Sequence, residues 1–376
     1  MALHVAVIGA GAFGGWTALH LLRAGTRVTL LDAWGPGNAR ASSGGDTRVI
    51  RGIYGDNRRY VELTARAFAL WWEHEARWQR RLYHRTGALW MFAGDDGYAR
   101  STLPLLREIG LEVAELGPAD AAKRYPQIDL AGVRTAFYEI EAGYLLARQA
   151  CEMVRAGFVA ESGEYRMLSV RPLPISGGGL RGVALSDGTT LEADRFVFAC
   201  GPWLGQLFPD VIGDRLTPTR QEVFFFGPPP GDTRFDDGHC PVWMDFGERF
   251  MYGIPGNDRR GFKVADDTRG PRIDPTTEER LPTAAAIARA RELVARRFPA
   301  LAGAPIVESR VCQYEQSPDN HFILDRHPAA ENLWLAGGGS GHGFKMGPAV
   351  GELVARLVLG TAEVEPQFSL NRFSRS

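Results

Sequence analysis

The chain has 376 residues, 45% of them hydrophobic and 23% charged, which is typical of a globular protein with ample material for a core. The formal net charge of -1 gives no electrostatic reason to expect a nucleic acid or an anionic membrane as partner. No apolar run reaches the roughly 20 residues of a membrane-spanning helix. The first residues also lack the charged and cleavable regions of a secretion signal. We therefore expect a cytoplasmic enzyme of two domains or one large composite.

The N-terminal segment predicts a dinucleotide-binding unit of strand, helix and strand, over residues 4–8, 13–24 and 27–31. Gly9, Gly11 and Gly14 have the G-x-G-x-x-G spacing between the first strand and the helix. Such glycines let the backbone approach a pyrophosphate, whose negative charge lies at the helix N-terminus. Asp32 ends the second strand, where a carboxylate accepts a hydrogen bond from a ribose hydroxyl.

Later in the chain we expect an amphipathic helix over residues 60–78, a hairpin over 183–194 and a buried strand over 195–199. An arginine-rich helix over 282–298, a second buried strand over 333–336 and a last helix over 347–359 follow. Strands that run into glycine-rich turns therefore occur at the start of the chain, near residue 200 and near residue 337. A glycine-rich turn this late in the chain is more typical of flavin enzymes than of nicotinamide dehydrogenases.

We predict an α/β composite fold in which a Rossmann-like FAD-binding domain is built from discontinuous segments. Its segments are residues 1–53, 140–212 and 308–376. An inserted substrate domain with a mixed sheet is expected over residues 54–139 and 213–307.

The cysteines and lysines are few. Cys151, Cys200, Cys240 and Cys312 are widely spaced and form no C-x-x-C pair, so neither a disulfide framework nor a metal site is predicted. Of the 43 basic residues only three are lysines: Lys123, Lys263 and Lys345. Lysine is a compact point charge, whereas arginine is a planar fork. In a chain that uses arginine so consistently, a lysine is retained either where the smaller cation is needed or by chance.

Four stretches, together with the N-terminal fingerprint, carry a family resemblance. They are SSGGDTRVIRGIYG (42–55), MYGIPGNDRRGFKVA (251–265), VCQYEQSPDNHFILDRHP (311–328) and SGHGFKMGPAVGE (340–352). The chain resembles the monomeric sarcosine oxidase family, which includes N-methyltryptophan and pipecolate oxidases and belongs to the D-amino-acid-oxidase superfamily of flavoproteins. The resemblance extends from the first strand to the last helix. It implies a monomer that oxidises a secondary amino acid to an imine by hydride transfer to N5 of FAD, with O₂ reduced to H₂O₂.

The resemblance also implies which residues bind FAD. They are Gly9, Gly11, Gly14, Asp32, Ser42, Ser43, Thr47, Arg48, Val170, Gly201, Trp203, Cys312, Gly341, His342, Gly343, Phe344 and Lys345. Cys312 matches the cysteine that holds the flavin 8α-methyl group through a thioether, and the alternative is a buried free thiol. Arg48 would place a positive charge at the flavin face, which the N-terminus of the helix over residues 347–359 would supplement.

For substrate and oxygen, the resemblance assigns a second set of residues. Arg51 and Lys345 would clamp the substrate carboxylate, and Tyr252 and Tyr314 would line the substrate cavity. Lys263 matches the lysine that activates O₂, although a lysine at a strand edge can simply be solvated. Lys345 could instead be a helix cap, but cations are unfavourable at a helix N-terminus, so a bound anion explains it better.

Four positions depart from the family pattern. Asp267 replaces a histidine, Glu315 a threonine, Gly44 a supporting histidine and Trp243 a pocket methionine. We assign Trp243, Asp267 and Glu315 to the substrate site. Acids near a carboxylate site repel an anion unless the far end of the substrate is cationic or forms hydrogen bonds. The hypothesis is an amino acid larger or more polar than sarcosine.

Three alternatives remain open at this point. A dehydrogenase would pass its electrons to an acceptor other than O₂, and Lys263 argues against it. A non-catalytic flavin-binding subunit would keep the nucleotide fingerprint but lose Arg51 and Lys345, and both are present. A nicotinamide dehydrogenase would lack the yellow colour of a flavoprotein.

Overall fold

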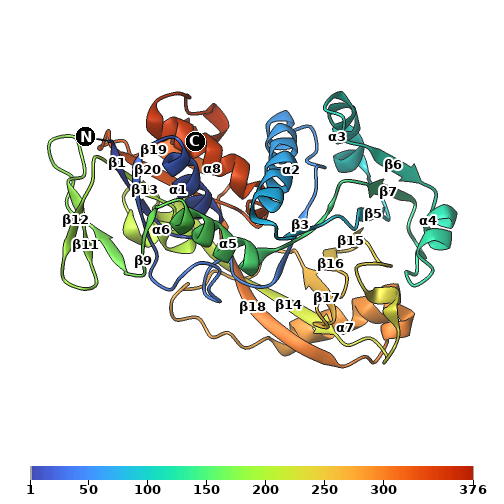
Figure 1. Ribbon diagram of the computed structural model, residues 1–376. Helices are drawn as coiled ribbons and strands as arrows, with labels where there is room; N and C mark the ends of the chain where they lie inside the picture. The colour runs from blue at the N-terminus through green and yellow to red at the C-terminus, as the bar shows by residue number, and fades with distance from the viewer. Residues whose placement is uncertain (1, 376) are drawn as a thin grey trace.

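The computed structural model describes residues 2–375, and a six-stranded sheet organises the part that carries the nucleotide fingerprint (Figure 1). Its strand order is β19 (Ile323–Arg326), β20 (Leu333–Gly337), β13 (Arg195–Phe198), β1 (His4–Ile8), β2 (Arg27–Leu31) and β9 (Glu164–Arg166). All neighbours pair in parallel except β19 and β20. Strands distant in sequence therefore lie side by side, as expected for a domain assembled from separate segments.

The predicted strand–helix–strand unit is confirmed, with α1 spanning Ala12–Arg23 between β1 and β2. Gly9 has a φ of 104°, and a Cβ there would lie 2.3 Å from the carbonyl oxygen of Ala199, so only glycine fits. A Cβ on Gly14 would likewise meet the Gly9 oxygen at 1.9 Å. Helix α1 packs against α5 (Ala147–Ala160) and α8 (Gly347–Leu359). The glycines thus serve close packing as well as access to a ligand.

An eight-stranded mixed sheet forms the second layer of the molecule. Its order is β18 (Ile306–Gln316), β14 (Thr217–Phe226), β17 (Phe262–Asp266), β16 (Phe250–Ile254), β15 (Val242–Phe246), β5 (Ala88–Phe92), β7 (Thr135–Glu139) and β6 (Val113–Leu116). One face packs on α4 (Pro118–Arg124) and α7 (Ala284–Arg297), forming a core of its own. The opposite face carries the side chains that line the candidate site.

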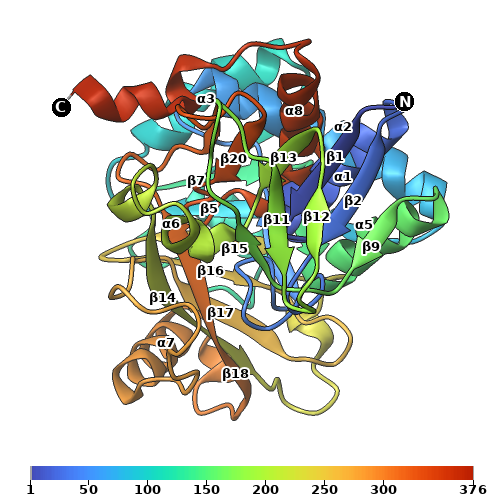
Figure 2. The same cartoon turned by 90° about the vertical axis from the view of Figure 1, so that its left-hand side faces the viewer.

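Two smaller sheets and three helices complete the fold (Figure 2). The sheets contain β10 (Val170–Pro172), β11 (Gly182–Leu185) and β12 (Thr190–Glu192), and β3 (Thr47–Ile50), β8 (Gly143–Leu146) and β4 (Tyr83–His84); the helices are α2 (Arg58–Trp78), α3 (Gly97–Glu108) and α6 (Leu204–Leu207). The predicted hairpin is confirmed, because β11 and β12 pair in antiparallel fashion around Gly188, whose φ is 85°. Within the described residues, no helix is long and apolar enough to cross a membrane.

The mixed α/β fold agrees with the prediction, but one predicted boundary cuts through an element. Residue 308 was expected to begin the last segment of the nucleotide domain, yet it lies inside β18. This strand pairs with β14 from Ile306 to Gln316, so its hydrogen bonds place it in the eight-stranded sheet. The chain returns to the six-stranded sheet only at β19. The remaining domain limits stay predictions.

Candidate active site

A first cavity of about 290 Å³ opens at the carboxyl ends of β1 and β2. Twelve of the predicted cofactor residues line it: Gly9, Gly11, Asp32, Ser42, Ser43, Arg48, Val170, Gly201, Trp203, Gly341, Gly343 and Phe344. In parallel sheets ligands bind outside these strand ends, so the position is the expected one. Gly14 instead packs beneath Gly9, while Thr47 lies next to Arg48 and is 1% exposed.

Asp32 and the start of α1 form one end of this first cavity. The Asp32 carboxylate accepts hydrogen bonds from the backbone N–H groups of Ala10 at 2.8 Å and of Trp34 and Gly35 at 2.9 and 2.8 Å. Burial raises the pKa of Asp32, and these three N–H groups oppose that rise. The first turn of α1 contains no acidic residue. An anion at this helix end therefore meets the positive end of the helix dipole, and no carboxylate of the first turn itself competes for it.

A second cavity, of about 470 Å³, adjoins the first. Arg48, Tyr314, Gly341 and Phe344 line both of them. The second cavity also contains most of the predicted substrate residues: Arg51, Tyr252, Asp267, Tyr314 and Lys345, with His342 beside them. The structure therefore brings the predicted cofactor and substrate residues together in two adjoining spaces.

Arg51 and Lys345 are two neighbouring cations that feel the charges of nearby acids, Glu139 among them. Lys345 is 4% exposed, and its ammonium donates to the Tyr54 hydroxyl at 2.7 Å and to the carbonyl oxygen of His342 at 2.7 Å. The Arg51 guanidinium lies over the rings of Tyr54 at 4.3 Å and Trp90 at 5.2 Å. Neither forms an ion pair within residues 2–375. Burial and then the charge of Arg51 hold the pKa of Lys345 well below its usual value, so a bound anion would stabilise both cations.

The predicted site residues do not include Glu139, Tyr54 or Trp90, which the structure places near Arg51. Glu139 is 2% exposed, and its carboxylate accepts hydrogen bonds from the backbone N–H of Gly52 and from Nε1 of Trp90. It therefore fixes the turn that follows Arg51. An acid at the end of the apolar stretch TAFYE was the available signal, but the pairing with residue 52 spans 87 positions.

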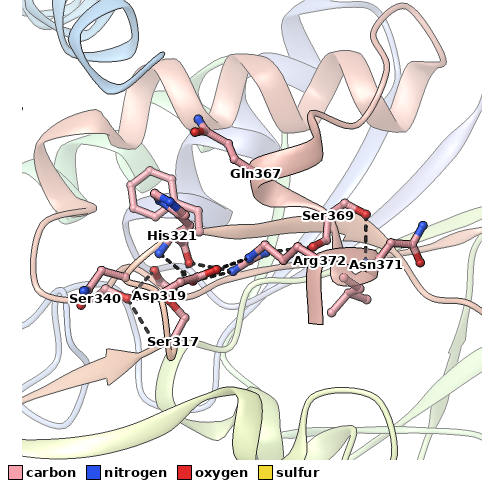
Figure 3. Close-up of polar contacts among 12 residues, drawn as sticks. Ser317, Asp319, His321, Ser340, Gln367, Ser369, Asn371 and Arg372 are labelled. Carbon is pink, nitrogen blue, oxygen red and sulfur yellow. Dashed lines mark hydrogen bonds and ion pairs between the residues drawn. The ribbon is translucent and has the colours of Figure 1, made fainter. Parts of the chain in front are cut away.

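Hydrogen bonds hold the segment 317–321, of which Asn320 and His321 line the second cavity (Figure 3). Arg372 donates to both Asp319 carboxylate oxygens at 2.7 and 3.2 Å and to the His321 carbonyl at 3.1 Å. Ser317 donates to the same carbonyl at 2.7 Å. The His342 ring nitrogen Nε2 lies 2.9 Å from the carbonyl oxygen of Asn320, which can only accept. This contact fixes the proton of the neutral ring on Nε2, so Nδ1 remains an acceptor, 3.4 Å from the Tyr54 hydroxyl.

Lys263 lies on β17, on the face of the eight-stranded sheet that lines the second cavity. It is 3% exposed and donates to the carbonyl oxygen of Thr47 at 2.9 Å. Burial first, and then the nearby charge of Arg48, lower the pKa of Lys263 to about 7. No acidic side chain forms an ion pair with it among the described residues. The ammonium is therefore not merely solvated, as the alternative interpretation held.

Asp267 follows β17 and faces Arg51 and Lys345 across the second cavity. Its carboxylate accepts a hydrogen bond from the Tyr314 hydroxyl at 2.9 Å and pairs with Arg269 at 3.1 Å. Burial raises the pKa of Asp267, and Arg269 opposes the rise. Because Arg269 already neutralises this acid, the substrate does not need a cationic far end to be accommodated.

An aromatic wall, defined as Trp90, Tyr98, Phe246, Phe250 and Tyr252, forms the apolar side of the second cavity. Phe246 stacks on Phe250 with 4.3 Å between the ring centroids and on Trp90 with 5.6 Å. Tyr98 lies 6.3 Å from Trp90. The aromatic wall begins next to Arg51, whose guanidinium lies over the ring of Trp90.

The prediction that Trp243 lines the substrate site is wrong. Trp243 is fully buried on the other face of β15, where its ring lies 6.0 Å from Phe262 and 4.9 Å from Phe298. Neighbouring side chains of a strand point to opposite faces, so the next residue, Met244, lines the cavity instead. A shift of one residue along a strand exchanges the two faces, which is the difference between Trp243 and Met244.

The comparison with protein families decides the identity of the fold. A family model described as FAD dependent oxidoreductase matches residues 4–357. The chain belongs to this family. A monomeric sarcosine oxidase of Bacillus sp. (strain B-0618) is 31% identical, over 98% of this chain and 95% of that protein. An N-methyl-L-tryptophan oxidase of Salmonella arizonae is 29% identical, over 98% and 97%.

A solved structure supports the same conclusion about the fold. The crystal structure of L-proline dehydrogenase from P. horikoshii has a TM-score of 0.87 at 21% identity and covers 100% of this chain and 98% of that chain. The family model and the two relatives confirm the resemblance recognised from the motifs.

The residues of the first cavity fit FAD. Glycine backbone surrounds the start of α1, Asp32 offers carboxylate oxygens, and Arg48 lies where the two cavities join. Two buried oxygens that border the cavity, Ser42 Oγ and Glu315 Oε2, have no hydrogen-bond partner among the described residues. Buried polar atoms are normally paired, so both are available to a polar ligand. Dinucleotide binding at these strand ends agrees with the fold.

Two other predicted residues occupy informative positions. Cys312 lies on β18, two residues before Tyr314 and on the same face, and it is one of four free cysteines. Glu315 points to the opposite face, where it lines the first cavity and is not part of the second. The assignment of Glu315 to the substrate is therefore wrong, again because side chains alternate along the strand.

Proposed function

We propose that this FAD-dependent oxidoreductase is an oxidase of a secondary amino acid. In the reaction the amine is oxidised to an imine and O₂ is reduced to H₂O₂. The observation that carries the proposal is the pair of cations Arg51 and Lys345, which line a cavity adjoining the first one and form no ion pair within the described residues. Two such cations form a binding site for a single carboxylate.

The chain's own side chains supply binding, orientation and charge. When bound, the flavin accepts the two electrons that leave the substrate. Arg51 offers its planar guanidinium and Lys345 a point charge to the substrate carboxylate. Tyr54 connects the Lys345 ammonium to His342, and the hydrogen bond from His342 to Asn320 keeps that connection in one protonation state. Lys263, next to Arg48, provides the positive charge for the reduction of O₂.

We further propose that the substrate carries a large apolar or aromatic side chain. The second cavity lies within the range of about 300–1,000 Å³ that is usual for drug-sized ligands. Its apolar side is the aromatic wall, which begins next to Arg51. An N-methylglycine has no side chain to bury there. The two relatives are named for substrates without a side chain (sarcosine) and with a large aromatic one (N-methyl-L-tryptophan), so both sizes of substrate occur among proteins similar to this chain.

A substrate series tests both the reaction and the side chain. We expect H₂O₂ from N-methylphenylalanine with a kcat/KM about 10- to 100-fold above that of sarcosine, because burying a phenyl group contributes about 1.5–3 kcal/mol. Both enantiomers and the cyclic amino acid proline belong in the series. Phe250→Ala should reduce the advantage of N-methylphenylalanine and leave sarcosine little affected. Faster oxidation of sarcosine would contradict the predicted side chain, and no H₂O₂ from any secondary amino acid would contradict the reaction.

The proposed covalent anchor has its own test. If a thioether joins Cys312 to the flavin, acid precipitation should carry the yellow colour into the protein pellet. Cys312→Ala should move it into the supernatant, and Cys151→Ala, at another free cysteine, should not. Yellow supernatant from the unaltered protein would show that FAD is held by non-covalent contacts alone.

A further inference from the structure

Glu315 is a buried carboxyl group with one unoccupied oxygen. The residue is 8% exposed, and its Oε1 accepts a hydrogen bond from the backbone N–H of Gly339 at 3.1 Å. Its Oε2 has no hydrogen-bond partner within residues 2–375. Glu315 also forms no ion pair with a described basic residue. Native proteins rarely leave a buried carboxyl oxygen without a hydrogen bond, so we expect a bound ligand to supply one to this atom.

The surroundings of Glu315 are built from backbone. A Cβ on Gly339 would lie 2.9 Å from Oε1, and a Cβ on Gly201 would lie 3.4 Å from Oε2. Gly337 also approaches Oε2, with its Cβ position 3.7 Å away. The turns after β13 and β20 therefore reach the carboxyl group without side chains of their own. A ligand can therefore approach Oε2 from the first cavity.

The position of Glu315 along the first cavity indicates which part of FAD it meets. Asp32 lies at one end, and Arg48 and Phe344 lie where the second cavity begins. Glu315 directly follows Tyr314, which lines both cavities, and its Oε2 lies against Gly201, just after β13, the strand next to β1. It thus lies between the adenosine end and the flavin ring. In FAD this span contains the pyrophosphate and the ribityl chain.

A carboxyl group is better suited to bind the ribityl chain of FAD than its pyrophosphate. A pyrophosphate is anionic and would repel a carboxylate, and the N-terminus of α1 already provides its binding site. A ribityl hydroxyl can both donate and accept a hydrogen bond. Burial raises the pKa of Glu315 to about 7, so the group can carry a proton and donate as well. We propose that Glu315 binds a hydroxyl group of the ribityl chain of FAD.

Release of FAD from matched variants tests this assignment. The parent is the Cys312→Ala holoenzyme, so that a covalent bond cannot hold the cofactor. Glu315→Met removes the polar atoms, whereas Glu315→Gln keeps a polar atom at each position. Each holoenzyme is diluted, the released FAD is measured by its fluorescence, and ADP, which lacks the ribityl chain, is titrated as a competitor.

We expect Glu315→Met to raise the dissociation constant of FAD about tenfold to a hundredfold. Glu315→Gln should stay within about threefold of the parent, and the dissociation constant of ADP should be the same in all three proteins. Unchanged FAD release in Glu315→Met, equal losses in both variants, or a parallel loss of ADP binding would overturn the proposal. If Glu315→Met does not fold, Glu315→Ala makes the same comparison. The measurement involves no substrate, so failure of the amine oxidase proposal would leave its outcome unaffected.

Discussion

Replacing Lys345 by methionine should lower kcat/KM for the amino acid roughly 30- to 4,000-fold. Removing one partner from a buried, hydrogen-bonded charge pair typically costs about 2–5 kcal/mol, and Lys345 is 4% exposed next to Arg51. The loss should be in substrate binding, because the carboxylate retains only the Arg51 fork. The measurement is the steady-state kinetics together with the dissociation constant of acetate, a carboxylate that is not oxidised, followed by the flavin absorbance.

The chain offers a matched control for this substitution. Lys123→Met also removes a lysine charge, but the Lys123 side chain is 82% exposed and its ammonium lies 3.8 Å from Asp120 on the surface. Exposed ion pairs contribute little, so kinetics and acetate binding should stay as in the unaltered protein. Acetate binding that survives in Lys345→Met at full strength would show that the substrate carboxylate binds elsewhere.

Lys263→Met should slow reoxidation of the reduced enzyme by O₂ about 100- to 1,000-fold, the usual effect of removing one group that stabilises a developing anion. Reduction of the flavin by substrate without oxygen should remain nearly intact, because Lys263 lies beside Thr47 and Arg48 and not in the carboxylate clamp. Stopped-flow absorbance measures the two half-reactions separately. Equal losses in both half-reactions would contradict an oxygen-specific role.

The pH dependence gives a second readout of Lys263. Its pKa is lowered to about 7, so the ammonium is present below this pH and is lost as the pH rises through it. Reoxidation of the unaltered enzyme should therefore slow as the pH is raised, whereas Lys263→Met should lack this dependence. A dehydrogenase that uses another acceptor would show slow reoxidation at every pH, with or without Lys263.

Local patterns were sufficient for the nucleotide-binding part of the fold. Gly9, Gly11 and Asp32 lie in one contiguous segment, and spacing along the chain determines where they meet. The family motifs likewise placed Arg51 and Lys345 in one cavity although 294 positions separate them in the sequence. These predictions succeeded because each motif contains its own strand end or helix start.

The errors arose where a strand's two faces had to be distinguished. Trp243 and Met244, like Tyr314 and Glu315, are adjacent residues that point to opposite faces, and a one-residue displacement reverses the assignment. Contacts between distant strands, such as that of Glu139 with Gly52, left no local signal. Gly44 is explained only by the structure, since a Cβ there would lie 2.2 Å from the Asn38 carbonyl oxygen. A histidine could not occupy that backbone without a rearrangement.

The order of segments in the six-stranded sheet affects how the protein is made. Strand β20 and helix α8 join β13 and α1, which are synthesised far earlier. Gly343 and Phe344, between those two late elements, complete the wall of the cofactor cavity. During translation α5, β9 and β13 can cover part of the early β1–α1–β2 unit, but the surface of α1 that packs on α8 stays uncovered until residues 347–359 have left the ribosome. A complete site for FAD therefore exists only after residues 333–359 have been made.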